Sequence, residues 1–202
     1  MNGGYDDGYQ ECPCFWGLEA GSLVQSFLQR HSVEGFEILD LGCGEGKNAA
    51  AFARAGGLVT AIDCSSLAIE NGKRAFPKLS IDWQVGDAIN ILQDINKFDV
   101  VVMYGLAHCL DTKAAIENLI KLAISQTKTG GFHMLVAFNN RSQDLAKAHP
   151  GFSPTLISHS DYLNSYSDHE IQTESDTILE ETHPHNGIAH HHSLTRIEVR
   201  IR

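Results

Sequence analysis

The chain has 202 residues, of which 43% are hydrophobic and 20% charged, an ordinary composition for a globular domain. Its formal net charge of −10 argues against a nucleic-acid or membrane-surface partner, because both select clustered Lys and Arg. The first ten residues are polar and acidic, and no apolar run approaches the length of a membrane span, so we expect neither a signal peptide nor a transmembrane helix. Five irregularly spaced cysteines favour free thiols in a reducing cytoplasm.

The chain begins with a segment that we interpret as an N-terminal arm, residues 1–16, which is rich in Gly, Tyr and Asp. Residues 22–32 then show helical spacing of apolar side chains, and Ser22 is the expected N-cap of that helix.

From Phe36 onward, short apolar runs alternate with helical patterns. The predicted strands are residues 36–41, 58–63, 79–85, 98–105 and 131–138. The predicted helices between them are residues 47–55, 66–75, 88–95 and 112–126. This rhythm is typical of βαβ units, so we expect an α/β fold with a mostly parallel sheet covered on both faces.

The last third of the chain departs from this rhythm. Residues 139–170 are polar and contain two prolines, and we expect them to form a cap on the substrate side. Residues 169–183 and 195–202 predict a terminal hairpin, because residues 195–202 alternate strictly between two faces. The last strand is expected to run antiparallel to its neighbour. The whole chain, 1–202, is interpreted as one domain.

A glycine cluster follows the first predicted strand in the sequence ILDLGCGEG, residues 38–46. Gly42, Gly44 and Gly46 precede a predicted helix, so bare amides and a helix N-terminus lie at the carboxyl end of a strand, where open parallel sheets bind ligands. Asp63 ends the next strand, 23 residues after Asp40, a position suited to bonding both hydroxyls of a ribose.

The spacing differs from that of dinucleotide-binding proteins. Their fingerprint is G-x-G-x-x-G, whereas this chain has G-x-G-x-G with Lys47 in place of the third glycine. Asp40, two residues before the first glycine, would repel a pyrophosphate but suit a cationic ligand. These residues therefore indicate a nucleoside that carries a positive group. A glycine cluster can also be no more than a tight turn.

The motif ILDLGCGEG resembles the first motif of class I S-adenosylmethionine-dependent methyltransferases, and the likeness extends from Phe36 to Arg202. The resemblance implies a Rossmann-like, doubly wound, seven-stranded and mostly parallel sheet with an antiparallel last strand. It implies that Asp40, Gly42 and Gly44 face the amino-acid part of S-adenosyl-L-methionine, and that Asp63 binds its ribose.

The resemblance extends to two later segments. Residues 86–88, GDA, resemble the segment whose acid contacts the adenine amino group, here Asp87, with Ala88 beside it. Acids after strands also serve as helix caps, which is the alternative for Asp87. Residues 103–110 resemble the segment that lines the methyl-transfer site. Finer similarity suggests the small-molecule branch that includes tellurite-resistance-type enzymes.

Candidate residues on the substrate side are Tyr104, His108, His190 and Trp16. Methyl transfer requires mainly that nucleophile, carbon and sulfur are aligned, and a base only if the nucleophile arrives protonated. His108 could accept a proton, hold the substrate or serve as a capping residue. Trp16 could close over the cofactor or anchor the arm in the core.

A histidine-rich loop, residues 183–192, joins the two strands of the predicted hairpin. If the penultimate strand is parallel to the rest, this loop emerges at the ligand edge. Metal binding, substrate contact and a plain solvated hairpin are the three interpretations. The familiar zinc spacings are absent, so no metal site is predicted.

The predicted function is methyl transfer from S-adenosyl-L-methionine to a small-molecule acceptor. A non-catalytic S-adenosylmethionine-binding module and a nicotinamide-dependent oxidoreductase are the alternatives. No sequence pattern predicts which atom accepts the methyl group or what the oligomeric state is.

Overall fold

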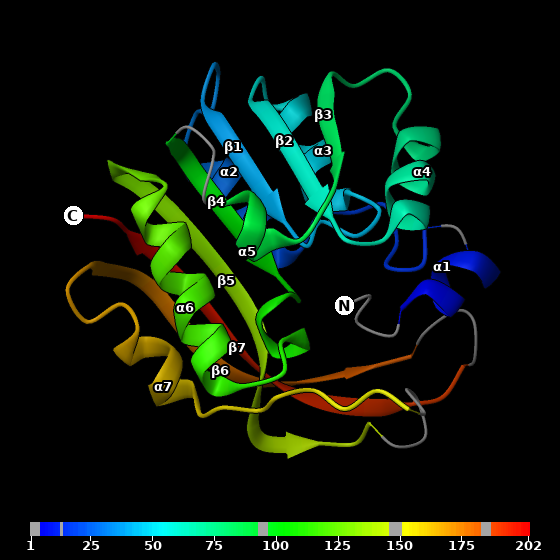
Figure 1. Cartoon of the computed structure of the whole chain (residues 1–202), viewed down its shortest axis with the longest axis vertical. Coiled ribbons are helices and arrows are strands. Elements are labelled where there is room, and N and C mark those ends of the chain that lie inside the picture. The colour runs from blue at the N-terminus through cyan, green and yellow to red at the C-terminus, as the bar shows by residue number, and fades with distance from the viewer. Residues whose placement is uncertain (1–4, 13, 93–96, 146–150, 183–186) are drawn as a thin grey trace.

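The computed structural model describes residues 5–12, 14–92, 97–145, 151–182 and 187–202. A twisted sheet crosses the molecule and helices lie on both of its faces (Figure 1). Its seven strands stand in the order β3-β2-β1-β4-β5-β7-β6. The strands are β1 Glu37–Leu41, β2 Leu58–Asp63, β3 Ile81–Val85, β4 Phe98–Tyr104, β5 Thr127–Gln143, β6 Glu170–Glu181 and β7 His190–Arg200.

The pairing confirms the predicted topology. Strands β1 to β5 pair in parallel, whereas β7 is antiparallel to both β5 and β6. Strand β6 therefore runs in the direction of the parallel strands, so the segment that joins β6 to β7 starts at the same edge of the sheet as the glycine turn. β5 is much longer than predicted, because its second half continues toward the start of β7 with an irregular register between Phe138 and Gln143.

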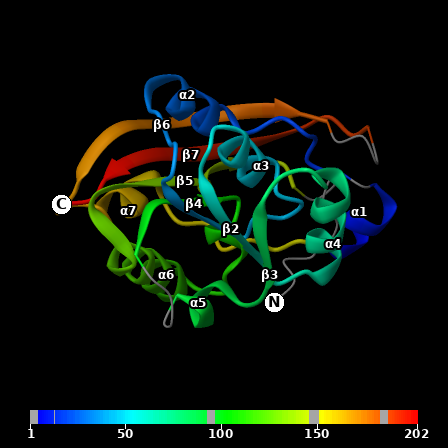
Figure 2. The same ribbon diagram turned by 90° about the horizontal axis from the view of Figure 1, so that it is seen from above.

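The helices divide between the two faces of the sheet, as Figure 2 shows from above. Apolar side chains of α2 and α3 pack on one face, and those of α6 with residues of α7 pack on the other. α4 lies beside β2 and β3, and α1 packs against α4 (Figure 1). The helices are α1 Asp6–Glu11, α2 Ser22–Arg30, α3 Lys47–Arg54, α4 Ser66–Ala75, α5 Ala88–Ile91, α6 Lys113–Ser125 and α7 His159–Asn164.

Three local predictions differ from the structure. The prediction that Ser22 caps α2 is wrong, because Gly21 is the N-cap and Ser22 is the first helical residue. Helix α5 ends at Ile91 rather than at 95, and residues 93–96 lie outside the described residues. Helix α1 was not predicted, since its sequence DDGYQE carries no apolar periodicity. Among the described residues, no helix is long and apolar enough to cross a bilayer.

Strand β7 carries a buried carboxylate, Glu198, on the face that α2 covers. The side chain of Glu198 is fully buried, and its carboxylate accepts hydrogen bonds from Arg30 of α2 at 3.1 and 2.5 Å. By the alternation of residues 195–202, Glu198 shares a face with the charged residues Arg196 and Arg200. The helix that packs on that face buries it, and the guanidinium compensates the carboxylate that burial would otherwise leave unpaired.

The N-terminal arm is held by polar contacts with the glycine turn and with α4. The carboxylate of Glu45 accepts hydrogen bonds from the backbone N–H groups of Cys14 (2.8 Å) and Phe15 (2.6 Å). The Asn71 amide donates to Glu45 Oε1 and to the carbonyl oxygen of Tyr9, both at 2.9 Å. Glu45 lies within the glycine motif, so the same turn that ends β1 also holds the arm.

We expect Glu45→Gln to loosen the arm. The substitution places an amide NH₂ against a backbone N–H that had a carboxylate oxygen as its acceptor, which costs about 1–3 kcal/mol. Hydrogen–deuterium exchange of the Cys14 and Phe15 amides should then quicken by about tenfold or more. Glu70→Gln, on the exposed surface of α4, is the matched control and should leave the arm unchanged. Equal exchange in both variants would contradict the assigned role of Glu45.

Candidate functional site

The glycine turn between β1 and α3 has a backbone that only glycine adopts readily. Gly42, Gly44 and Gly46 have φ angles of 65°, 53° and 79°. A Cβ atom on Gly46 would lie 2.2 Å from the Trp83 ring, and one on Gly44 would lie 2.9 Å from the Tyr9 hydroxyl. The backbone of the turn therefore packs closely against β3 and the arm, with no room for side chains.

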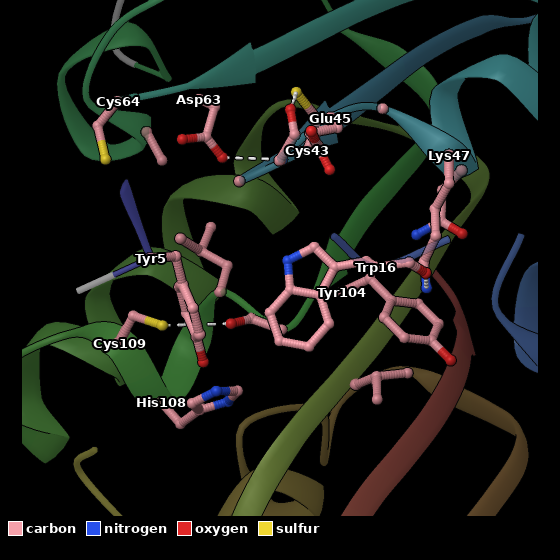
Figure 3. A pocket seen from close by; sticks show the side chains of 18 of the residues that line it. Tyr5, Trp16, Cys43, Glu45, Lys47, Asp63, Cys64, Tyr104, His108 and Cys109 are labelled. Atoms are coloured by element: carbon pink, nitrogen blue, oxygen red, sulfur yellow. Dashed lines mark hydrogen bonds between the residues drawn. The ribbon is translucent and has the colours of Figure 1, made fainter. Parts of the chain in front are cut away.

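A cavity of about 280 Å³ lies over this turn, at the carboxyl ends of the parallel strands. The arm, the segment after β4, and the ends of β6 and β7 also contribute to its walls (Figure 3). Most of the predicted site residues line it: Gly42, Gly44, Asp63, Asp87, Ala88, Trp16, Tyr104 and His108. Asp40 and His190 lie outside the described lining of this cavity.

The Asp63 carboxylate is held by backbone groups at the tip of β2. Its Oδ2 accepts a hydrogen bond from Gly44 N–H at 2.8 Å, and its Oδ1 accepts one from Ser65 N–H at 2.9 Å. Burial raises the pKa of Asp63, and these two hydrogen bonds oppose the rise. Each carboxylate oxygen keeps a further lone pair, so Asp63 can still accept hydrogen bonds from two ligand hydroxyls.

Asp87 performs the capping role that was the alternative for it. Its Oδ1 accepts hydrogen bonds from Ile89 N–H and Asn90 N–H, both at 3.0 Å, at the start of α5. The side chain also borders the cavity, as does its neighbour Ala88. Capping engages only Oδ1, which leaves Oδ2 for a hydrogen-bond donor in the cavity.

Asp40 does not line the cavity. It is buried, and its Oδ2 accepts a hydrogen bond from Ala49 N–H in α3 at 3.0 Å. Burial raises the pKa of this carboxyl to about 7. Its Oδ1 has no hydrogen-bond partner among the described residues. A cationic ligand in the cavity would favour the ionised form of Asp40.

Trp16 and Tyr104 form one wall of the cavity (Figure 3). The indole packs edge-on against Tyr5 and Phe15, with ring centroids 5.2 and 4.7 Å apart, and Lys47 Nζ donates to the Trp16 carbonyl oxygen at 3.0 Å. Trp16 therefore both anchors the arm and borders the cavity, so the two interpretations of this residue are compatible.

His108 lies in a short 3₁₀ turn after β4, Ala107–Cys109, on a different part of the wall from Tyr104 (Figure 3). Its ring stacks on Phe138 with centroids 4.1 Å apart, and its Nδ1 accepts the Phe138 backbone N–H at 3.1 Å. An acceptor at Nδ1 places the proton of the neutral ring on Nε2. His108 can therefore donate a hydrogen bond from Nε2, which suits holding a substrate better than removing its proton.

Several cavity residues were missed by the sequence analysis, among them Tyr5, Glu45 and Glu181. Tyr5 lies beside His108 and Cys109 in Figure 3, and burial raises the pKa of its hydroxyl well above the usual range. Its only signal in the sequence is an aromatic residue in a polar arm. Glu181 lines the wall because β6 ends at the cavity. Predicting this position would have required knowledge of the strand order.

His190 is the first residue of β7, and β7 reaches farther toward the loop than predicted. It pairs with Glu181 across the hairpin and borders a shallower surface hollow beside the main cavity. His183 and His185 lie outside the described residues. Residues 139–170 approach the site through Phe152, whose ring is 5.2 Å from Tyr5 and 6.0 Å from His108.

The cavity thus combines backbone amides, two carboxylates on successive strand ends and an aromatic wall. The Gly44 surface is a cradle that a Cβ atom would fill, and Asp40 contributes a buried carboxylate oxygen that has no hydrogen-bond partner among the described residues. Such a site fits a ligand with ribose hydroxyls and a positive charge.

Residues 38–131 match a family described as methyltransferase domain. The chain is 32% identical over 97 residues to a ubiquinone biosynthesis O-methyltransferase of Coxiella burnetii, which covers 46% of this chain and 42% of the relative. It is 33% identical over 119 residues to the enzyme of the same name from Methylocella silvestris, which covers 57% of this chain and 45% of the relative. The chain therefore spans less than half of the length of these curated relatives.

Among solved structures, TehB from Haemophilus influenzae has a similar fold. The TM-score is 0.74 at 22% sequence identity, and the match covers 91% of this chain and 63% of that one. The matched domain, the curated relatives and the seven-stranded fold agree with the resemblance of the glycine motif. The chain therefore has the fold of the solved methyltransferase-like structures, and its residues 38–131 are similar to a methyltransferase domain.

Proposed function

We propose that this chain binds S-adenosyl-L-methionine in the cavity over the glycine turn and transfers its methyl group to a small-molecule nucleophile. One observation carries the proposal: the bare turn at Gly44 and the carboxylates of Asp63 and Asp87 border a single cavity. The names of the relatives, which are methyltransferases, support the same activity.

The residues of the cavity divide between the two ligands. The turn at Gly42 and Gly44 would hold the amino-acid part of the cofactor, Asp63 its ribose and Asp87, with Ala88, its adenine. Asp40 would stabilise the positive charge. Bound S-adenosyl-L-methionine supplies an electrophilic methyl group on a sulfonium.

The acceptor would bind on the side of Tyr5 and His108, where Phe152 brings the polar segment 139–170 close to the wall. His108 would donate from Nε2 to a lone pair of the acceptor and so orient it toward the methyl group. Orientation of this kind is a main source of rate in a displacement reaction. Tyr104, across the cavity, would help Trp16 to exclude water.

The location of the site favours a small acceptor. The cavity is partly covered by the arm, and the net charge of −10 opposes binding to nucleic acid or to an anionic membrane. The described cysteines, Cys12, Cys14, Cys43, Cys64 and Cys109, are free thiols, which supports a reducing cytoplasm as the place of action.

Calorimetric titration tests the ligand class. We expect S-adenosyl-L-methionine and its demethylated product to bind with one site per chain, and reduced nicotinamide nucleotides not to bind. Binding of a nicotinamide nucleotide in preference to both would support the oxidoreductase alternative and overturn the proposal.

Asp63→Ala should weaken binding of S-adenosyl-L-methionine by about 2 kcal/mol, because two ligand hydroxyls lose a charged acceptor. Asp63→Asn, which keeps the size of the side chain, should lose a large part of the same free energy. Asp82→Asn, an exposed acid on β3, is the matched control. If the dissociation constant changes in neither Asp63 variant, Asp63 does not bind the ribose.

His108→Asn should lower turnover by about tenfold or more while cofactor affinity changes little. The Asn side chain can still accept the Phe138 N–H, but it lacks the Nε2 donor. Turnover is measured against a panel of thiols, amines, phenols and chalcogen oxyanions, which also identifies the acceptor class. Normal turnover by the variant would show that His108 has only a structural role. If the wild type binds the cofactor but methylates no acceptor of the panel, the non-catalytic module is favoured.

A further inference from the structure

Three side chains of metal-ligand type meet at the open end of the terminal hairpin. Glu181 ends β6 and pairs with His190, the first residue of β7, and His192 follows two positions later. Since side chains alternate between the faces of a strand, both histidines project from the same face as Glu181. One ligand atom of each residue lies within 4.8 Å of the other two.

The distances among these atoms are close to those that one metal ion requires. Glu181 Oε1 is 3.0 Å from His192 Nε2 and 3.7 Å from His190 Nε2. Ligand atoms about 2.0–2.2 Å from a zinc-type ion lie roughly 3.0–3.5 Å from one another in tetrahedral or octahedral geometry. Small side-chain movements therefore bring all three into coordination distance of a single ion.

The hydrogen bonding of His190 indicates what its ring presents to Glu181. Its Nδ1 lies 2.8 Å from the carbonyl oxygen of Ile188, and only the nitrogen can donate in that bond. In the neutral ring, Nε2 then carries a lone pair that faces the Glu181 carboxylate. A cation between these two acceptors stabilises the arrangement, and a backbone carbonyl on the other nitrogen is typical of metal-bound histidine.

His192 is held in place by its neighbours. Its ring stacks on Phe138, with centroids 4.4 Å apart and planes 14° apart, and contacts His190 edge-on at 4.6 Å. Both histidine side chains are buried, whereas Glu181 is 29% exposed. The two imidazoles are therefore positioned before any ion binds, which lowers the entropy cost of binding.

The surroundings offer a path and a favourable charge for a cation. A shallow surface hollow reaches His190 and Glu181, and Asp144 and Glu180 also border it. Three carboxylates around one hollow attract divalent cations. Glu181 borders the main cavity as well, so the cluster adjoins both the surface hollow and that cavity.

The geometry points to a divalent transition-metal site formed by Glu181, His190 and His192. Two imidazoles and one carboxylate suit ions such as Zn²⁺, Co²⁺, Ni²⁺ or Fe²⁺, and they leave coordination positions open. An oxygen, nitrogen or sulfur atom of the methyl acceptor would occupy an open position, and this second step rests on the proposed function. The sequence analysis predicted no metal here, because the carboxylate ligand stands across a hairpin and completes no familiar spacing.

The site is tested on the full chain after treatment with a chelator and in the absence of S-adenosyl-L-methionine. We expect one equivalent of Zn²⁺ or Co²⁺ to bind with a dissociation constant on the order of 1 µM or below. Bound Co²⁺ should show visible absorption bands of a low-coordinate site. Glu181→Gln keeps the size of the side chain and should weaken binding at least about tenfold.

His191→Ala is the matched control, because its ring lies on the opposite face of β7 and contacts the Ser142 hydroxyl at 2.9 Å. It should bind the metal as the wild type does. His192→Ala should lose binding, and circular dichroism must show that this variant is folded. Absence of stoichiometric binding to the wild type, or loss of binding in His191→Ala but not in Glu181→Gln, would overturn the site.

The metal titration is independent of methyl transfer. If the metal binds but metal-free protein fails to bind S-adenosyl-L-methionine, the proposed function fails and the metal site stands. If the cofactor binds and no metal does, the metal site fails alone.

Discussion

The hydrogen bond from the Gly44 backbone N–H to the Asp63 carboxylate joins the two strand ends on which the rest of the site depends. It holds the left-handed turn after β1 against the tip of β2, so that α3 can begin at Lys47. The bond needs a backbone at Gly44 that no side chain obstructs, because the arm lies within contact distance on the other side. Without this turn the cavity would lose its floor, and the arm would lose the residue that holds it.

Three segments that are far apart in the sequence come together around this turn. The arm contacts Glu45 of the turn, the segment after β4 supplies His108, and the terminal hairpin supplies Glu181. Stacked rings connect the last two, since Phe138 lies between His108 and His192. The aromatic column stiffens this wall of the cavity, whereas hydrogen bonds and edge-on aromatic contacts hold the arm.

The alternation of strands and helices and the direction of the strands were predictable, because most buried strands are short apolar runs and the crossover helices are periodic. The position of two acids at the cavity was also predictable, since Asp63 ends β2 and Asp87 follows β3, and a parallel sheet brings these strand ends to one edge. The position of Asp40 was not, because the sequence does not tell whether a residue before a turn lines the cavity. Tyr5 and Glu181 were missed for a related reason: they reach the cavity only through tertiary packing of segments with weak local patterns.

The burial of Glu198 illustrates the same limit. An alternating strand predicts two faces, but the identity of the element that covers each face comes from the fold. Helix α2 covers the face of β7 that carries Glu198, and it brings Arg30 to the carboxylate. The alternation in the sequence therefore predicted correctly which residues of β7 share a face. It did not predict which element covers each face.

The hairpin register has a consequence for how this edge of the molecule can change. The pairing that places Ile197 and Val199 in the apolar core also decides which of three consecutive histidines turn toward Glu181. A deletion or insertion of one residue between His192 and Thr195 would exchange His190 and His192 for their neighbours while leaving the core strand intact. The number of residues in this stretch therefore decides which histidines face Glu181.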